Sequence, residues 1–192
     1  MKIGLFFGSF NPIHVGHLII ANYLAEQTDL DRVWLVVSPQ NPLKKKSTLA
    51  NDYERLHLVH LAVEGSPKLR ASKVEFGLPQ PSYTVDTLAH LRERHPEHEF
   101  VLLMGGDSLA SLPRWKNYEQ LLAQHQIYVY NRPDYTPAEA LRQHPSVRWF
   151  DAPLMQISAS FVRRCLRAGK SIRYLVTEPV FNYLEASNLY RK

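Results

Sequence analysis

Patterns typical of buried strands alternate with patterns typical of helices along the whole chain. Apolar, β-rich runs occupy residues 2–7, 32–37, 100–104, 127–130 and 147–150, and helical periodicity lies between them. No internal repeat or low-complexity linker interrupts this order. Because parallel strands are joined by helical crossovers, the alternation predicts an α/β protein built on a doubly wound parallel sheet.

Capping and chain-breaking residues place the remaining elements. Helices are expected at residues 15–26, 51–64, 85–94, 118–124 and 137–142. Short strands are expected at 69–71 and 73–76. Ser158 can cap a helix that ends at Gly169, and a final amphipathic helix follows Glu178. We therefore expect a single domain over residues 1–192, whose C-terminal portion from about 158 to 192 is helical.

Composition narrows the class of protein. The chain has 192 residues, of which 45% are hydrophobic, and this suits one sizeable core. A single cysteine, Cys165, permits no internal disulfide. No apolar run approaches the roughly 20 residues of a membrane span, and the N-terminal apolar run stops at Gly8 without a cleavage pattern. These features predict a cytoplasmic protein that does not associate with membranes.

The charge distribution points to a small anionic ligand. The formal net charge is +5, and basic residues cluster at 44–46 and again at Arg163, Arg164, Arg167 and Lys170. No basic stripe with interleaved aromatic residues runs along the chain, so nucleic acid is not expected as a partner. Phosphate is the anion that these clusters favour.

The first strand leads into a loop whose residues suit phosphate binding. Residues 8–17 read Gly-Ser-Phe-Asn-Pro-Ile-His-Val-Gly-His, and the backbone amides of Gly8, Ser9 and Phe10 can approach a ligand closely. His14 and His17 are three residues apart at a helix start, where they share one face. No third ligand follows at a spacing suited to a metal. The alternative interpretation is that His14 caps the helix and His17 packs under the sheet.

This decapeptide resembles the nucleotide-binding signature of the nucleotidyltransferase superfamily, whose H-x-G-H is shared with class I aminoacyl-tRNA synthetases. A second superfamily signature, I-S-x-x-x-[IV]-R, is matched by residues 157–163. Between them, P-S-Y-T at 81–84, G-G-D-S at 105–108, Trp115 and N-R-P at 131–133 resemble the bacterial nicotinate mononucleotide adenylyltransferases. The resemblance implies a Rossmann-like nucleotidyltransferase fold and adenylyl transfer from ATP to nicotinate mononucleotide, a step of NAD biosynthesis.

The resemblance also implies roles for individual residues. The catalytic residues are expected to be His14, His17 and Arg163. The ATP site is expected to add Gly8, Ser9, Phe10, Gly105, Asp107 and Ser158. The mononucleotide site is expected to contain Lys44, Tyr83, Thr84, Trp115 and Arg132. Mg²⁺ is expected to arrive with ATP rather than to be held by protein ligands, since no carboxylate cage is visible.

Each of these residues also has a structural interpretation. Arg163 and Lys44 can be solvated, Asp107 can cap a helix, Trp115 can belong to the core, and residues 83–84 can simply begin a helix. The chain departs from the family pattern at Phe7, Asn11, Leu43 and Phe161.

Competing functions stay open as well. They are adenylyl transfer to nicotinamide mononucleotide or phosphopantetheine, and nucleotide sensing without catalysis. An RNA-binding module related to the synthetases is disfavoured because 192 residues leave no anticodon-binding domain. A homo-oligomer is compatible with the sequence but not indicated by it.

Overall fold

The structure of the protein, a computed structural model, describes residues 1–39, 49–132 and 136–191. Within these residues, six strands form one sheet: β1 (Lys2–Gly8), β2 (Arg32–Val37), β3 (Leu69–Ser72), β4 (Glu99–Gly105), β5 (Ile127–Tyr130) and β6 (Val147–Phe150). Their order is β3-β2-β1-β4-β5-β6, and every pairing is parallel. The prediction of a doubly wound parallel sheet is confirmed.

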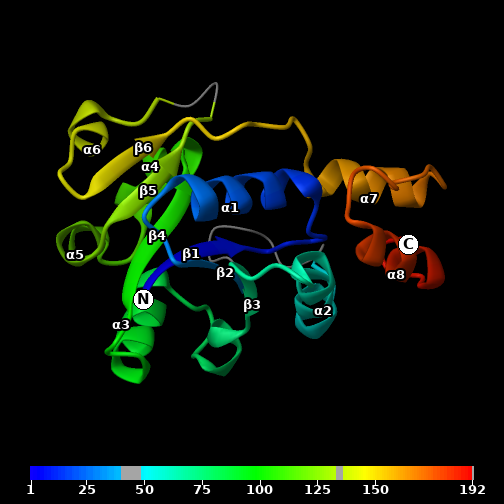
Figure 1. Cartoon of the computed structure of the whole chain (residues 1–192), viewed down its shortest axis with the longest axis horizontal. Coiled ribbons are helices and arrows are strands. Elements are labelled where there is room, and N and C mark those ends of the chain that lie inside the picture. Colours follow the sequence, from blue (N-terminus) through cyan, green and yellow to red (C-terminus); the bar gives the residue numbers. More distant parts are fainter. Residues whose placement is uncertain (40–48, 133–135, 192) are drawn as a thin grey trace.

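The direction of winding reverses between the two central strands, β1 and β4 (Figure 1). Gly8 at the end of β1 pairs with Val37 at the end of β2, and Phe6 pairs with Leu103 of β4. The carboxyl ends of these strands therefore lie together at one edge of the sheet. In open α/β sheets this switch point is where ligands bind.

Helices cover both faces of the sheet. The described helices are α1 (Val15–Gln27), α2 (Asp52–Val63), α3 (Thr84–Arg94), α4 (Gly106–Ser111), α5 (Tyr118–Gln124), α6 (Glu139–Arg142), α7 (Ala159–Arg167) and α8 (Glu178–Ala186). Two 3-10 turns, η2 (Val74–Gly77) and η3 (Leu112–Arg114), join them. The short helix α4 directly follows β4, and Asp107 lies in its first turn rather than at its cap, which is Gly105.

Alternate residues along the strands pack into two separate hydrophobic cores, one on each face of the sheet. Phe6, Leu35 and Leu103 pack with α1, α2, α7 and α8, whereas the neighbouring Leu5 and Leu102 pack with α3, α4, α5 and α6. Because both faces are covered, the central strands are apolar on both sides, which explains their unbroken hydrophobic runs.

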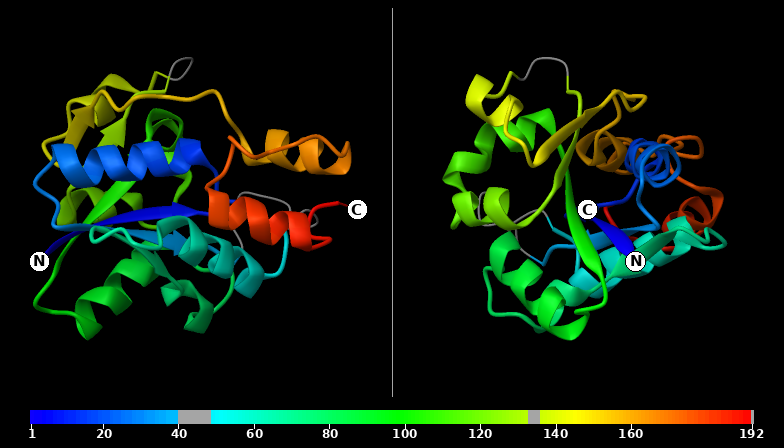
Figure 2. Two further views of the ribbon diagram at one scale, coloured as in Figure 1. Left: turned by 45° about the vertical axis from the view of Figure 1, so that its right-hand side comes forward. Right: turned by 60° about the vertical axis from the view of Figure 1, so that its left-hand side comes forward.

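The C-terminal helices extend the first core beyond the sheet edge. Figure 1 and Figure 2 show α7 (orange) and α8 (red) side by side, beyond the N-terminal end of α1. The backbone N–H of Val15, the first residue of α1, donates to the carbonyl of Leu175 at 2.9 Å. These contacts bring the C-terminal signature next to the first loop. No helix in the described ranges is long and apolar enough to cross a membrane.

One predicted strand is wrong. Residues 73–76 were expected to be extended, but Val74–Gly77 forms the 3-10 turn η2. β3 pairs with β2 only as far as Ser72, which lies opposite Val36, one residue before β2 ends. If β3 continued through residue 76, its last residues would lie beyond the end of β2 and have no strand to pair with. The chain turns instead, and Glu75 is buried in the protein.

Candidate active site

The loop between β1 and α1 is built around the side chain of Phe10. Phe10 adopts a left-handed backbone conformation (φ 41°), and its ring is buried against Phe6 and His17, with centroid separations of 6.0 and 5.1 Å. A β-carbon on Gly8 would lie 2.8 Å from this ring, so only glycine fits there. Phe10 can therefore offer a ligand its backbone but not its side chain, as the predicted role of this loop requires.

His14 and His17 form a stacked pair at the start of α1. Their ring centroids are 3.7 Å apart with an interplanar angle of 26°. The backbone N–H of His14 donates to Nδ1 of His17 at 3.3 Å. Because Nδ1 of His17 accepts this bond, the neutral ring carries its proton on Nε2. His17 thus has the tautomer of a hydrogen-bond donor to phosphate.

Burial distinguishes the two histidines chemically. His14 is the N-cap residue of α1 and is only 5% exposed. Burial, together with the positive charge of Arg132, lowers the pKa of His14 from 6.5 to about 4. His14 is therefore neutral at pH 7. His14 thus occupies the N-cap position that the structural interpretation expects, and its role in binding a nucleotide stays a prediction.

The second signature reaches back to the first through Arg163. Nη1 of Arg163 donates to the backbone carbonyl of Asn11 at 2.6 Å, and Nη2 lies 3.3 Å from the hydroxyl of Ser160. Ser158 caps α7 by accepting a hydrogen bond from the backbone N–H of Phe161 at 3.2 Å. Arg163 is therefore not a solvated helix residue.

Asn11 explains how one departure from the family pattern is tolerated. Its Oδ1 accepts the backbone N–H of Ala50 at 3.1 Å, an acceptor role that an aspartate can also perform. Phe161, another departure, is exposed, and the guanidinium of Arg164 lies 5.7 Å from its ring centre. Neither departure disturbs the contact between Arg163 and the loop.

The ends of β4 and β5 supply a third part of the site. Gly105 caps α4, and Asp107 lies in its first turn. Nε of Arg132, which follows β5, is 3.9 Å from a carboxylate oxygen of Asp107. A β-carbon on Gly105 would clash with the carboxylate of Asp107 and lie 3.0 Å from the ring of Tyr130, so a larger residue would have to displace both side chains. The charge of Arg132 also acts on His14. Arg132, predicted to bind the mononucleotide, therefore lies with the residues predicted to bind ATP in the loop after β1, α4 and α7, which we call the ATP-side residues.

Tyr83, Thr84 and Trp115 form a second group. Tyr83 is the N-cap residue of α3, Thr84 begins that helix, and Tyr83 and Trp115 pack at the edge of the second core. Nζ of Lys116 lies 4.9 Å from the ring centre of Tyr83 and 2.8 Å from the carboxylate of Asp86. Since α3 returns from the carboxyl edge of the sheet, its N-terminal amides face the same edge as the ATP-side residues.

A buried acid beneath this second group was not found from the sequence. Glu75 in η2 is almost fully buried, and its Oε1 accepts the hydroxyl hydrogen of Thr87 at 2.9 Å. Burial raises the pKa of Glu75. Glu75 contacts Thr87 of α3 because the residues expected to form a strand at 73–76 form a 3-10 turn instead, which directs this side chain inward.

Arg55 is the second residue that sequence reasoning missed. It is 0% exposed, and its guanidinium donates to the carbonyls of Ser9, Ser38 and Ala50. Nη2 also pairs with the carboxylate of Asp52 at 2.7 Å. The only available signal was an Asp and an Arg spaced i, i+3 in a helix, which is usually a surface pair. Here the pair ties together the loops that follow β1 and β2.

The structure thus brings most of the predicted site residues to one edge of the sheet. One group contains His14, His17, Asp107, Arg132 and Arg163, and the other contains Tyr83, Thr84 and Trp115. Lys44 and Leu43 lie outside the described residues, and the role of Lys44 stays a prediction. In the described part of this site, Asp107 is a half-buried carboxylate already near Arg132, which does not resemble the multi-oxygen cage of a resident Mg²⁺.

Comparison with known proteins agrees with this geometry. The model of the family described as cytidylyltransferase-like matches residues 5–165, so the chain is a nucleotidyltransferase. It is 53% identical over 193 residues to a protein of Flavobacterium johnsoniae named probable nicotinate-nucleotide adenylyltransferase, with 100% of each chain covered. A protein of Cytophaga hutchinsonii with the same name is 53% identical over 190 residues, covering 99% of this chain and 98% of the relative.

The chain therefore belongs to the nicotinate-nucleotide adenylyltransferase family. A solved structure supports the fold. The nicotinic acid mononucleotide adenylyltransferase of Plasmodium falciparum, in complex with NaAD, superposes with a TM-score of 0.81 at 20% identity, covering 98% of this chain and 97% of that one. The expectation of a Rossmann-like nucleotidyltransferase enzyme is confirmed.

Proposed function

We propose that this enzyme transfers the adenylyl group of MgATP to nicotinate mononucleotide, forming nicotinate adenine dinucleotide and pyrophosphate. The observation that carries the proposal is the convergence of His14, His17 and Arg163 at the carboxyl edge of the sheet, joined through the loop after β1. The names of the relatives and the NaAD bound to the Plasmodium enzyme support the choice of acceptor.

The reaction is a displacement at the α-phosphorus of ATP. An oxygen of the mononucleotide phosphate forms a new bond to this phosphorus, and the bond to the bridging oxygen of the β-phosphate breaks, releasing pyrophosphate. The attacking phosphate is already an anion at neutral pH, so the enzyme needs no strong general base. Catalysis then rests on alignment of two polyanions and on neutralising the charge that develops on the leaving group.

The described residues can divide this work. His17 donates from Nε2 to a phosphate oxygen, and the neutral His14 supports it from the stacked position. Arg163, held at the loop by Asn11, binds the β- and γ-phosphates, with Ser158 at the nearby helix start. Gly105 and Asp107, at the end of β4 and in the first turn of α4, would contact the adenosine. Mg²⁺ enters with ATP and is held mainly by phosphate oxygens and water.

The acceptor binds at the start of α3. The amides of Tyr83 and Thr84 and the partial positive charge of the helix end attract the pyridine carboxylate, and Trp115 can stack on the ring. We also propose that Arg132, which lies near Asp107 and whose charge acts on His14, meets the mononucleotide phosphate. The enzyme works in the cytoplasm, where ATP and its acceptor occur.

A pyrophosphate-release assay tests the proposal. Purified protein with MgATP is given nicotinate mononucleotide, nicotinamide mononucleotide or phosphopantetheine in turn, and the dinucleotide product is identified by mass. We expect turnover with the first acceptor, and none above background for a His14→Asn/His17→Asn variant. Faster turnover with phosphopantetheine, or ATP binding without turnover on any acceptor, would contradict the proposal and favour another acceptor or a sensor.

A further inference from the structure

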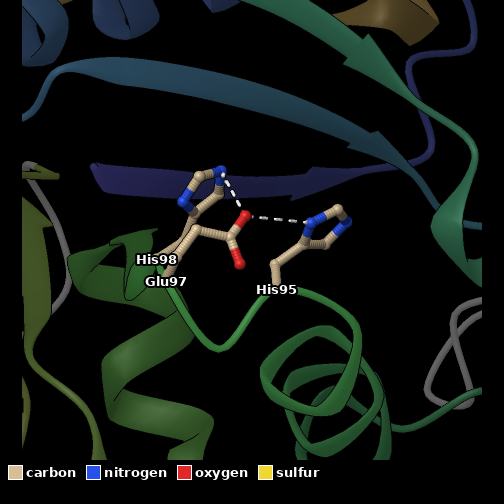
Figure 3. Close-up of side chains that lie close together, drawn as sticks. All are labelled: His95, Glu97 and His98. Atoms are coloured by element: carbon tan, nitrogen blue, oxygen red, sulfur yellow. Dashed lines mark ion pairs between the residues drawn. The ribbon is translucent and has the colours of Figure 1, made fainter.

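Two histidines and a glutamate gather in the turn between α3 and β4. His95 is the C-cap residue of α3, and the backbone N–H of His98 donates to its carbonyl at 3.0 Å, which closes the turn. Glu97 lies between them, and Pro96 stiffens the segment. Figure 3 shows both imidazoles directed at one oxygen of the Glu97 carboxylate.

The spacing of the three ligand atoms suits a tetrahedral metal ion. Nδ1 of His95 is 3.5 Å from Oε1 of Glu97, and Nε2 of His98 is 3.4 Å from the same oxygen. A direct charge-assisted hydrogen bond would be shorter, at about 2.8 Å. Ligands about 2.05 Å from a tetrahedral zinc ion lie about 3.3 Å apart. All three atoms lie within 4.8 Å of one another, so small side-chain shifts can close the set.

Neighbouring aromatic residues hold the two imidazoles in place. The rings of His95 and His98 are nearly parallel, with an interplanar angle of 9° and centroids 5.5 Å apart. His95 meets the edge of Trp34 at 6.0 Å, and His98 meets Phe100 at 6.1 Å. The site is therefore partly organised before any ion binds, which reduces the entropic cost of binding.

The ligand set is accessible and chemically selective. The side chain of Glu97 is 60% exposed and that of His98 is 17% exposed, and His98 also lines a cleft of about 680 Å³ that reaches His125 and His144. An ion can thus enter from solvent. Imidazole nitrogens favour zinc-type ions, whereas Mg²⁺ prefers an all-oxygen shell.

We propose that His95, Glu97 and His98 bind one zinc-type divalent ion, with water completing its coordination. The site lies where β4 begins, so the length of this seven-residue strand, about 20 Å, separates it from the ATP-side residues. The bound ion ties the end of α3 to the start of β4 and takes no part in adenylyl transfer. It is independent of the proposed function.

The surroundings also set the expected affinity. Nδ1 of His98 is buried and has no hydrogen-bond partner in the described ranges, so the ring lacks the outer acceptor that usually supports a metal-bound histidine. Such an acceptor is typically worth about 10–100-fold in affinity. We therefore expect binding in the micromolar rather than the nanomolar range.

The test uses tag-free protein that has been treated with a chelator. Calorimetric titration with Zn²⁺ should give one ion per chain, and Co²⁺ should give the visible absorption of a tetrahedral complex. The melting temperature should rise with Zn²⁺ concentration. Each of His95→Ala, Glu97→Gln and His98→Gln should weaken binding by at least about 10-fold. Glu97→Gln should leave the fold unchanged because this side chain is the most exposed of the three.

His60→Ala, an exposed histidine on α2, is the matched control and should bind like the parent. Saturating ATP and excess Mg²⁺ should not displace the ion, which separates this site from His14 and His17. The proposal is overturned if a variant that combines His95→Ala, Glu97→Gln and His98→Gln binds Zn²⁺ as tightly as the parent, or if the parent takes up no ion at micromolar concentration.

Discussion

Arg163 in α7 and Asn11 in the first loop, 152 residues apart, are joined by a hydrogen bond of 2.6 Å from the guanidinium to the backbone carbonyl. This bond links the two signatures of the chain across the start of α1. Because Nη1 is used for this bond, the position of the guanidinium is fixed relative to the first loop, and the proposed contact with the phosphates falls to its other donors. The C-terminal helices thus complete the site that the first loop begins.

Replacing Arg163 tests this geometry. Arg163→Ala should reduce kcat/KM for ATP by at least about 100-fold, since a charged donor to the triphosphate is lost. Arg163→Lys should recover only part of this, because lysine cannot bond the Asn11 carbonyl and two phosphate oxygens together. Steady-state kinetics with ATP varied provide the measurement. Equal activity of the lysine variant and the parent would show that charge alone matters.

His17 should act on the rate more than on binding. His17→Ala should lower kcat by about 100-fold with little change in ATP affinity, because its Nε2–H meets charge that develops in the transition state. His17→Gln keeps a donor and should retain more activity than His17→Ala. Single-turnover rates and ATP binding by calorimetry separate the two effects. A raised KM at normal kcat would make His17 a binding residue only.

Most of the fold could be predicted from periodicity, since the central strands are apolar on both faces. The prediction of a strand at 73–76 is wrong because these residues have the sequence pattern of a strand but β2 is too short to pair with all of them. Among the site residues, those in contiguous signatures were found. Arg55 and Glu75 were not, because their importance depends on burial between segments distant in the sequence, and a lone charged residue in a helix or turn gives no local signal of burial.

Arg55 should govern stability more strongly than any surface arginine. Its fully buried guanidinium bonds the carbonyls of Ser9, Ser38, Pro39 and Ala50 and the carboxylate of Asp52, so Arg55→Met would leave these acceptors unpaired. We expect a loss of about 3–5 kcal/mol in the free energy of unfolding. Urea unfolding followed by circular dichroism measures it, with the exposed Arg70→Met as the matched control. A loss below about 1 kcal/mol, typical of surface pairs, would contradict this.

His14 makes stability depend on pH. The pKa of His14 is lowered from 6.5 to about 4, so the unfolded chain binds this proton more readily than the folded protein does. Stability from the neutral His14 is complete above pH 6.5, declines as the pH falls below this value, and is lost near pH 4. The shift corresponds to about 3 kcal/mol. Urea midpoints between pH 4.5 and 7.5 should fall more steeply in the parent than in His14→Asn. Parallel curves would refute this role.

The last prediction concerns the choice of acceptor, which depends on the start of α3. Nicotinate and nicotinamide mononucleotides differ only in a carboxylate against a carboxamide, so donors and positive charge around that group must discriminate between them. Tyr83 and Thr84 provide helix-end amides, and Lys116, whose Nζ lies 4.9 Å from the Tyr83 ring centre, offsets the negative charge of Asp86 at this helix start. Asp86 does not oppose the anion, because it is paired with Lys116 at 2.8 Å, while the carboxylate of Glu75 is engaged by Thr87 within the helix.

We therefore expect kcat/KM for nicotinate mononucleotide to exceed that for nicotinamide mononucleotide by several powers of ten, since donors that lose their anion are left poorly satisfied. Lys116→Met should reduce this ratio about 10-fold, mainly by weakening use of the nicotinate form. Lys68→Met, which breaks a comparable exposed pair with Glu26, is the matched control and should leave the ratio unchanged. Both acceptors are compared at saturating ATP. A parent ratio near unity would mean that the carboxylate is not recognised at residues 83–84, and an unchanged ratio in Lys116→Met would confine recognition to the helix amides.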